Sequence, residues 1–374
     1  MTKRGWNKIR HLELLYAALV ISSGLPDIQI NNFHLVEAKN QAKQMEITSP
    51  KASVYQEEQI SVLESPEAKV WGQNENPYTI LANEGIIQTK TQDMTLQKNC
   101  TVTSPDGTVF QSENLFFDNK KGYLTSDEDV VASRKADQLS DTIEMTGKGL
   151  LIDMNTDVYH VLSNVRAQRR GKDKNDLRIF SKKSSIYPNR NKAIFMGTVR
   201  VYGQNMELNG DKLTAHLGNQ KGNAGLDNLE LEADNEGNRK ITAKLEKITL
   251  YSKAVKIKFD KKGNFSQLEA DGAVDAVTSD KIKMRSENLV YKIVDGKEKV
   301  LLKDSVEIQT TDRTAKCQEA EYFPDTGEIV LSRVATVKKG DQILRGEKIR
   351  FSIKNSQVFV EKASGEMLRQ NLGF

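Results

Sequence analysis

Residues 106–131 read DGTVFQSENLFFDNKKGYLTSDEDVV, and they contain one full copy of a pattern that recurs along the chain. Apolar and polar residues alternate on both sides of Asn119-Lys120-Lys121-Gly122. Alternation with a period of two is typical of a β-strand with one buried face, and Asn and Gly favour tight turns. The stretch therefore predicts a β-hairpin.

Related copies of this stretch lie in both halves of the chain. Each has a small residue, two mostly polar residues and a short apolar run, as in SENLFFD from Ser112 and SENLVYK from Ser286. The other copies begin at Ser49, Ala82, Gly147, Ser181, Gly210, Leu245, Cys317 and Gly346. Successive copies are about 33 residues apart, and a turn and a second apolar strand follow each. A single hairpin cannot bury its apolar face but stacked hairpins can, so we predict an all-β protein of repeated hairpins.

Composition narrows the class of protein further. Of the 374 residues, 37% are hydrophobic and 28% charged, which is too apolar for a disordered chain and too polar for a multi-span membrane protein. The net charge of +4 is spread along the chain with acids and bases interspersed. Nucleic-acid binding needs a concentrated basic patch, so we expect no nucleic-acid partner.

The sequence carries none of the common catalytic or metal-binding motifs. The sequence has no GxxxxGK[ST], GxSxG or HExxH motif, and its four histidines are far apart. Cys100 and Cys317 have no zinc spacing and form no disulfide framework, which favours two separate buried thiols. We therefore expect no catalytic residue, no cofactor and no bound metal. A carbohydrate-active β-helix enzyme stays open as an alternative, because carboxylates distant in sequence can meet in space.

The N-terminus carries a targeting signal. Basic residues precede an apolar run at 14–25, which is shorter than the roughly 20 residues of a spanning helix. We assign residues 1–27 as a signal-anchor, with a cleaved signal peptide ending near Ser22-Ser23-Gly24 as the alternative. Both assignments export the rest of the chain. The basic stretch RAQRRGKDKND, between Val165 and Leu177, is the best domain boundary, and it gives domains 28–170 and 171–374.

These segments resemble a known transport family. An apolar N-terminal segment, INNFHLVE (30–37) and MTGKGLLIDMNTDVYHVLSNVRAQRR (145–170) resemble LptC, and the resemblance covers residues 1–170. Residues 177–374 resemble LptA, the OstA-like family, with ILRGEKIRFSIKNSQVFVEKA (343–363) near the end. The sequence thus resembles an LptC-like domain fused to an LptA-like domain.

The resemblance implies a fold of two consecutive twisted β-jellyrolls and a role without catalysis. It implies a periplasmic protein, anchored to the inner membrane by its N-terminal segment, that carries lipopolysaccharide with the lipid A acyl chains inside the jellyrolls. The implied partners are the subunits of the inner-membrane ABC transporter. A further LptA-like or outer-membrane LptD-like jellyroll would join through edge strands, with residues 358–362 as the free edge.

The residues expected to line the groove are apolar strand residues, although their strand register is open. In the first half they are Val54, Ile86, Leu115, Phe117 and Leu150, and in the second half Phe195, Val199, Val201, Leu289, Tyr291, Ile293, Ile349, Phe351, Ile353, Val358 and Val360. Plain core packing would select the same residue types. The main alternative function is therefore an exported structural or adhesive β-solenoid with no lipid ligand and a closed core.

Overall fold

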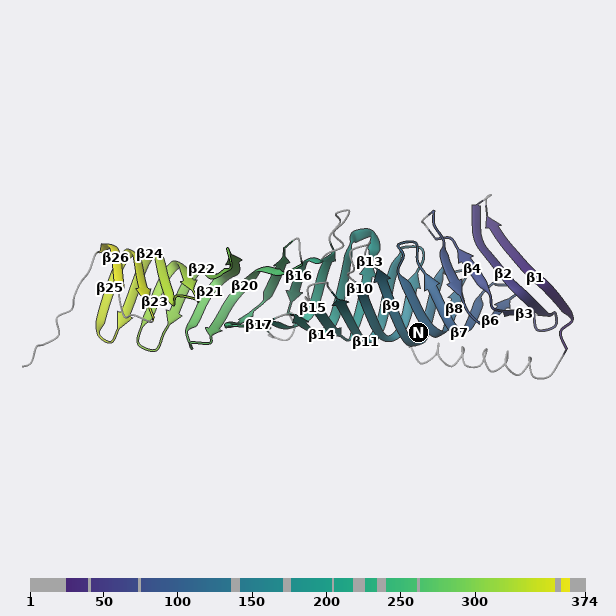
Figure 1. The fold of residues 1–374 in the computed structure, drawn as a ribbon, viewed down its shortest axis with the longest axis horizontal. Helices are drawn as coiled ribbons and strands as arrows, with labels where there is room; N and C mark the ends of the chain where they lie inside the picture. The colour runs from purple at the N-terminus through teal and green to yellow at the C-terminus, as the bar shows by residue number, and fades with distance from the viewer. Residues whose placement is uncertain are drawn as a thin grey trace, which may run out of the picture. The chain divides into compact units, whose positions relative to one another are not determined.

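The computed structural model describes residues 25–39, 42–72, 75–135, 142–170, 176–203, 205–217, 226–233, 240–260, 263–353 and 358–363. These residues form antiparallel β-strands and one short 3₁₀ helix, η1 (Pro188–Arg190) (Figure 1). The all-β prediction is confirmed. The signal-anchor assigned to residues 1–27 falls almost wholly outside the described residues. No helix in the described part of the chain is both long and apolar enough to cross a membrane.

The strands of the N-terminal part are β1 (Ile28–Lys39), β2 (Ala42–Tyr55), β3 (Ile60–Glu64), β4 (Glu67–Val70), β5 (Tyr78–Leu81), β6 (Glu84–Gln88), β7 (Met94–Thr103), β8 (Val109–Asp118), β9 (Tyr123–Lys135), β10 (Thr142–Asp153) and β11 (Val158–Arg170). The next strands are β12 (Leu177–Ser181), β13 (Lys183–Tyr187), β14 (Lys192–Gly203), β15 (Met206–Leu217), β16 (Leu226–Glu232), β17 (Ile241–Leu245), β18 (Ile248–Ser252) and β19 (Ala254–Phe259). The last are β20 (Phe265–Thr278), β21 (Lys283–Val294), β22 (Lys297–Gln309), β23 (Thr314–Phe323), β24 (Glu328–Lys339), β25 (Gln342–Ser352) and β26 (Val358–Ala363).

The chain divides into two compact units. The first unit runs to Arg134 and includes Glu144–Leu162, and the second takes in 135–143 and everything from Ser163 onward. The division between the units thus falls inside β9, β10 and β11.

The first unit has two layers, because each long strand bends near its middle and its two halves pair with different strands. The second half of β2 pairs with β3, and its first half pairs with β4. β3 then pairs with β6 and β4 with β5, and both β5 and β6 pair with β7. We call layer A the one that contains β3, β6 and Leu115–Asp118 of β8, and layer B the one that contains β4, β5 and Val109–Ser112 of β8. β1 pairs with β2 along its length.

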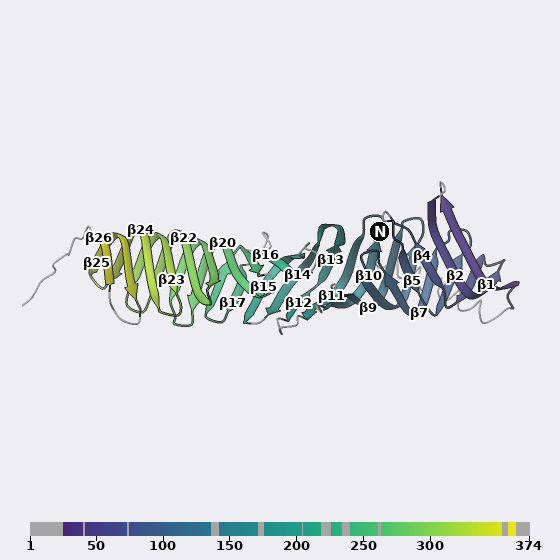
Figure 2. The same ribbon diagram turned by 45° about the horizontal axis from the view of Figure 1, so that its top comes forward.

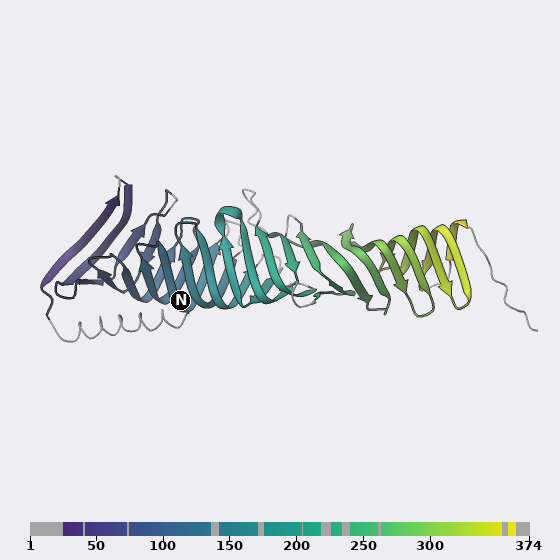
Figure 3. The same cartoon turned by 180° about the vertical axis from the view of Figure 1, so that it is seen from behind.

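The second unit repeats this arrangement. β15 pairs with β16 through its second half and with β17 through its first half. β16 pairs with β19, β17 with β18, and both β18 and β19 pair with β20. We call layer C the one that contains β13, β16 and β19, and layer D the one that contains β12, β17 and β18. From β20 to β26 the strands pair in chain order (Figures 2 and 3). β20 to β25 each fold across both layers, whereas β26 pairs mainly with the layer C half of β25.

The repeated small residue of the sequence marks the corner at which the chain passes from one layer to the other. At Ser49 the buried hydroxyl donates a hydrogen bond to the carbonyl oxygen of Lys51, 2.7 Å away. The same bond to the carbonyl two residues on recurs at Ser181, Ser252 and Ser286. A side chain of this size fits where two layers converge, and its hydroxyl satisfies a carbonyl that leaves the strand ladder.

The sequence pattern places one corner at the wrong residue. Leu245 ends β17 and precedes a turn within layer D, so it is not at a corner. The corner of that repeat is Ser252, between β18 and β19. The apolar run after Leu245 belongs to β18, which pairs within the same layer as β17.

A second type of corner uses two consecutive residues with positive φ. These pairs are Lys98-Asn99, Gly197-Thr198, Gly272-Ala273, Asp304-Ser305 and Arg333-Val334. Each pair coincides with a register shift in its strand. Such a bulge bends the strand and lets the residues on either side of it face the same interior.

The core lies between the two layers of each unit. In β21 the buried residues are Met284 and Ser286 before the corner and Leu289 and Tyr291 after it. The inward-facing set thus changes from even to odd numbers at the corner, which keeps apolar side chains inside.

Candidate functional site

Most of the residues predicted to line a groove are buried between the layers. The buried members are Ile86, Leu115, Phe117, Leu150, Phe195, Val199, Val201, Leu289, Tyr291, Ile349 and Phe351. Val54, Ile353 and Val360 are half-buried, whereas Ile293 and Val358 are exposed. Ile293 follows the inward parity of Leu289 and Tyr291 but lies near the end of its strand. Whether these residues contact lipid stays a prediction.

Side chains fill this interior rather than leaving a wide channel. The largest completely buried side chains include Tyr78, Phe110, Phe117, Tyr322 and Phe351. An acyl chain could enter only if the two layers separated. The layers are joined covalently at the corners, so we expect them to separate at the opposite side. We call this side the rim of each unit, and it is formed by the turns that connect the strands.

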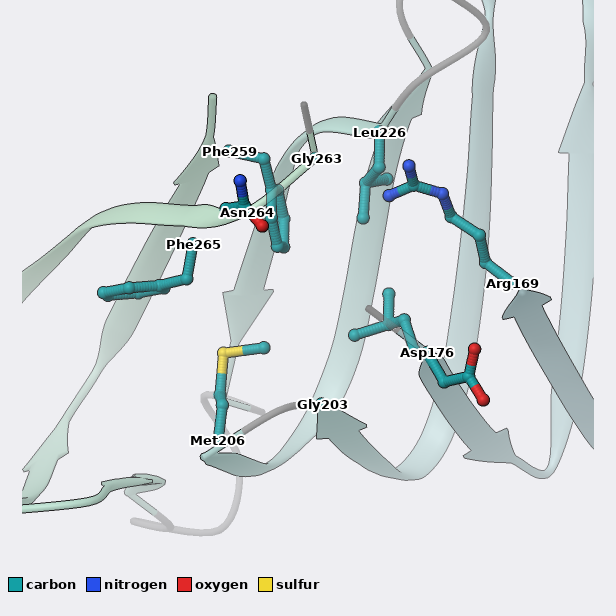
Figure 4. A pocket seen from close by; sticks show the side chains of 10 residues that line it. Arg169, Asp176, Gly203, Met206, Leu226, Phe259, Gly263, Asn264 and Phe265 are labelled. Atoms are coloured by element: carbon teal, nitrogen blue, oxygen red, sulfur yellow. The ribbon is translucent and has the colours of Figure 1, made fainter. Parts of the chain in front are cut away.

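The rim of the second unit contains a small cavity of about 50 Å³ (Figure 4). Layer D contributes Arg169, Leu177, Gly203 and Met206, with Asp176 just before β12. Layer C and its adjoining turn contribute Leu226, Phe259, Gly263, Asn264 and Phe265. The cavity therefore lies between the strand ends of the two layers.

The cavity is amphipathic. In Figure 4, Met206, Leu226, Phe259 and Phe265 surround the space, and the charged groups of Arg169 and Asp176 lie on one side of it. Arg169 reaches the opposite layer, because a Cβ placed on Gly263 would lie 2.6 Å from an Nη atom of Arg169. An apolar pocket with a charged border suits a molecule that has both an apolar chain and a charged group.

Further along the second unit an ion pair joins the layers. The Nζ of Lys247, in the turn between β17 and β18 of layer D, lies 2.9 Å from Glu298 and 2.9 Å from Asp325 in layer C. Hydrogen bonds to Asp325 and Glu298 raise the pKa of Lys247, and the bond from Lys247 lowers the pKa of Asp325. The guanidinium carbon of Arg313, from another layer D turn, lies 5.6 Å from the ring centroid of Phe351.

The two cysteines are free and buried. Burial raises the pKa of Cys100 to about 12 and that of Cys317 to about 11, so both thiols stay protonated at neutral pH. Cys317 lies at a corner of the second unit and Cys100 directly after one in the first. Within the described residues, no cluster of three or more His, Cys, Asp or Glu side chains is placed to hold a metal ion.

Two-layer units built from hairpins that fold at regular corners define the protein as an OstA-like β-jellyroll. Comparison with known families agrees with this class. Residues 17–170 match the family described as "Lipopolysaccharide-assembly, LptC-related". Residues 178–297 and 275–357 match "LptA/(LptD N-terminal domain) LPS transport protein". The chain belongs to the lipopolysaccharide-transport family as an LptC-like domain fused to an LptA-like domain.

One of the solved structures that match the chain is LptH, the LptA-homologous periplasmic component of the lipopolysaccharide transport device of Pseudomonas aeruginosa, at 15% sequence identity. The match covers 52% of this chain and 88% of LptH, with a TM-score of 0.17. No curated protein matches the chain.

Proposed function

We propose that this protein accepts lipopolysaccharide from an inner-membrane ABC transporter and passes it toward the outer membrane. The acyl chains would travel along the interior between the layers of each jellyroll. The observation that carries the proposal is the buried apolar face that continues from strand to strand within each unit. Membership of the lipopolysaccharide-transport family supports the same conclusion.

The energetics of the cargo require such a path. Each Å² of acyl surface exposed to water costs about 25 cal/mol, so several chains cannot cross the periplasm unprotected. In the proposed path, Leu115, Phe117 and Leu150 contact lipid in the first unit, and the buried residues from Phe195 to Phe351 do so in the second. The layers must separate at the rim to admit a chain, and the cavity beside Arg169 supports the proposal that entry into the second unit begins there.

The ends of the chain supply the proposed partners. At the C-terminal end, β26 pairs with β25 and presents Phe359, which is 62% exposed. An LptA-like or LptD-like jellyroll would add its own strand to this edge. At the other end, β1 would lie next to the transporter. Residues 1–27 would act as the signal-anchor that holds the protein at the inner membrane, and the two domains would divide at residues 170/171.

Photocrosslinking in cells tests the proposal. A photoreactive side chain is placed at the buried positions Phe351, Tyr291 and Phe117. Each has a matched neighbour that points the other way: Arg350, Lys292 and Asp118. Lipopolysaccharide adducts at the first set only, dependent on ATP hydrolysis by the transporter, are the expected result. A folded, exported protein that yields no adduct at either set would overturn the proposal.

One observation favours a second function. The interior is closed by side chains in the described structure, as expected of a structural or adhesive β-solenoid without a lipid ligand. The same experiment distinguishes the two functions, because a solenoid without a lipid ligand should give no lipid adduct at any inward position.

A further inference from the structure

The rim of the first unit is crossed by a buried hydrogen bond. The hydroxyl of Tyr78, the first residue of β5, donates to Oδ1 of Asp157 at 2.5 Å. Tyr78 is completely buried and Asp157 is 3% exposed. Asp157 has a φ of 52°, a left-handed conformation that Asp tolerates better than most residues. The turn thus holds this carboxylate against the phenol in spite of a less favoured backbone conformation.

A second bond runs beside the first. The hydroxyl of Tyr159 donates to Oδ1 of Asp106 at 3.1 Å. Asp106 is held in turn by hydroxyl bonds from Ser104 and Thr108 and by an ion pair with Arg134 at 3.2 Å. This carboxylate is therefore fixed by its own turn before Tyr159 reaches it.

Both bonds join layer A to layer B. Tyr78 begins a strand of layer B, and Asp106 lies in the turn between the layer B segments of β7 and β8. Asp157 and Tyr159 belong to the turn after β10 and to the strand that follows it. That turn lies beside layer A, because the Met154 amide donates to the Gly122 carbonyl at 3.0 Å. One bond therefore has its donor in layer B and its acceptor beside layer A, and the other bond has the reverse arrangement.

The two bonds are buried at the rim, next to the apolar interior. Burial is the main reason that the pKa values of both tyrosines are raised, so the phenols stay protonated donors. The Tyr159 ring also packs edge-on against Phe110, with centroids 5.1 Å apart. Apolar residues of the same size would fill this space equally well. Hydrogen bonds differ from apolar contacts because water or a polar lipid group can take the place of one partner, so these bonds can be broken and formed again.

We propose that the bonds Tyr78–Asp157 and Tyr159–Asp106 form a latch that keeps acyl chains out of the first unit until both bonds break. This inference rests on the proposed transport function. The latch determines whether an acyl chain can enter the first unit, but its four side chains do not line the path of the chain. They lie at the rim, whereas the predicted lining residue Leu150 lies in the interior.

The rim of the second unit is closed less firmly. Its cross-layer ion pair uses Lys247, whose side chain is 40% exposed, and a cavity lies between the layers at Arg169. Exposed ion pairs exchange with water at little cost. The two units therefore differ in how readily a chain can enter, and the latch makes the first unit the more restricted one.

The test uses the full chain with a photoreactive side chain at Leu150 in the first unit or at Phe351 in the second. Purified protein is titrated with lipopolysaccharide micelles, and adduct yields are compared for Tyr78→Phe, Tyr159→Phe and the double variant. Breaking one bond should raise the Leu150 yield by about fivefold, and breaking both should raise it by about thirtyfold. The Phe351 yield should not change. The control is Tyr55→Phe, which removes a phenol hydroxyl from the first unit outside the latch.

Each outcome decides a separate claim. If the Leu150 yield in folded variants equals that of the unsubstituted protein, the latch is wrong while the transport function stands. If the unsubstituted protein gives no lipid adduct at Phe351 in cells with an active transporter, the transport function fails and the latch fails with it. If the variants do not fold, amide hydrogen exchange of the unsubstituted protein tests the latch instead. Lipopolysaccharide should speed amide exchange in the turns at 104–108 and 154–158, and unchanged exchange there would overturn the latch.

Discussion

The Nζ of Lys247 lies 2.9 Å from Oδ1 of Asp325, although the two residues are 78 positions apart in the chain. One belongs to a turn of layer D and the other to a turn of layer C, so their contact closes part of the second unit's rim. At the rim the layers are held together by side-chain contacts such as this one, whereas at the corners the backbone itself joins them. Only the rim contacts can open without unfolding the strands.

We predict that Lys247→Gln loosens the rim of the second unit. Amide exchange in the turns that contain Lys247 and Asp325 should speed up by about two- to fivefold, because an exposed ion pair contributes little. The control is Lys256→Gln. Lys256 pairs with Glu230 at 2.8 Å, but both residues lie within layer C. Equal effects of the two substitutions would show that closure of the rim does not depend on the cross-layer contact.

The same ion pair predicts a pH dependence. The pKa of Asp325 is lowered in the folded protein, so its contribution is present above the ordinary Asp pKa of about 3.9 and is lost as the pH falls through the folded value. The pKa of Lys247 is raised, so its contribution is complete below about 10.4 and is lost as the pH rises through its folded value. The protection of these turn amides, expressed relative to their intrinsic exchange rates, should therefore hold between these limits and fall outside them. A Lys247→Gln variant should show no such plateau.

The sequence shows the corners more clearly than the rim. The spacing of Ser112 and Ser286 predicts a repeat, and the structure explains it, because a small residue stands at the corners of the first type, where the chain changes layers. The pattern wrongly predicts a corner at Leu245, because an apolar run follows a rim turn as well as a corner. No pattern in the sequence predicts the latch. Tyr78 and Asp157 are 79 residues apart, and only the stacking of turns from different hairpins brings them together.

We predict that Ser286→Ala lowers the free energy of unfolding by about 1 kcal/mol. The hydroxyl of Ser286 is buried and donates to the Asn288 carbonyl at 2.8 Å, so its loss leaves that acceptor without this donor. Chemical denaturation of the full chain, followed by a probe in the second unit, measures the change. Ser279→Ala at an exposed turn is the control and should be neutral. A neutral Ser286→Ala would mean that the corners need a small side chain but not its hydroxyl.

Val334 offers a stabilising substitution. Its φ is 58° and its side chain is 81% exposed, so a β-branched residue occupies a left-handed position with little packing to compensate. Val334→Asn should raise the stability of the second unit by about 1 kcal/mol, measured by the denaturation midpoint. The control is Val277→Asn, at a partly exposed strand position outside the positive-φ set, where Asn should be neutral or harmful. A destabilised Val334→Asn variant would mean that Val334 makes contacts that outweigh its strain.

The C-terminal edge gives the last prediction. Deleting residues 356–374 removes β26 and exposes β25, whose Phe351 and Ile349 are paired with Val358 and Val360 in the full chain. The deletion should abolish pairing with a downstream LptA-like or LptD-like jellyroll, because the edge strand offered to that partner is gone. A shorter deletion of residues 364–374 keeps β26 and should pair normally. Site-specific crosslinking between Phe359, or Arg350 in the longer deletion, and the partner jellyroll measures this. Far-UV circular dichroism should show a folded protein in both cases, since β1 to β25 keep their other partners. If the longer deletion still pairs, the partner must bind somewhere other than β26, and the exposure of Phe359 needs a different explanation.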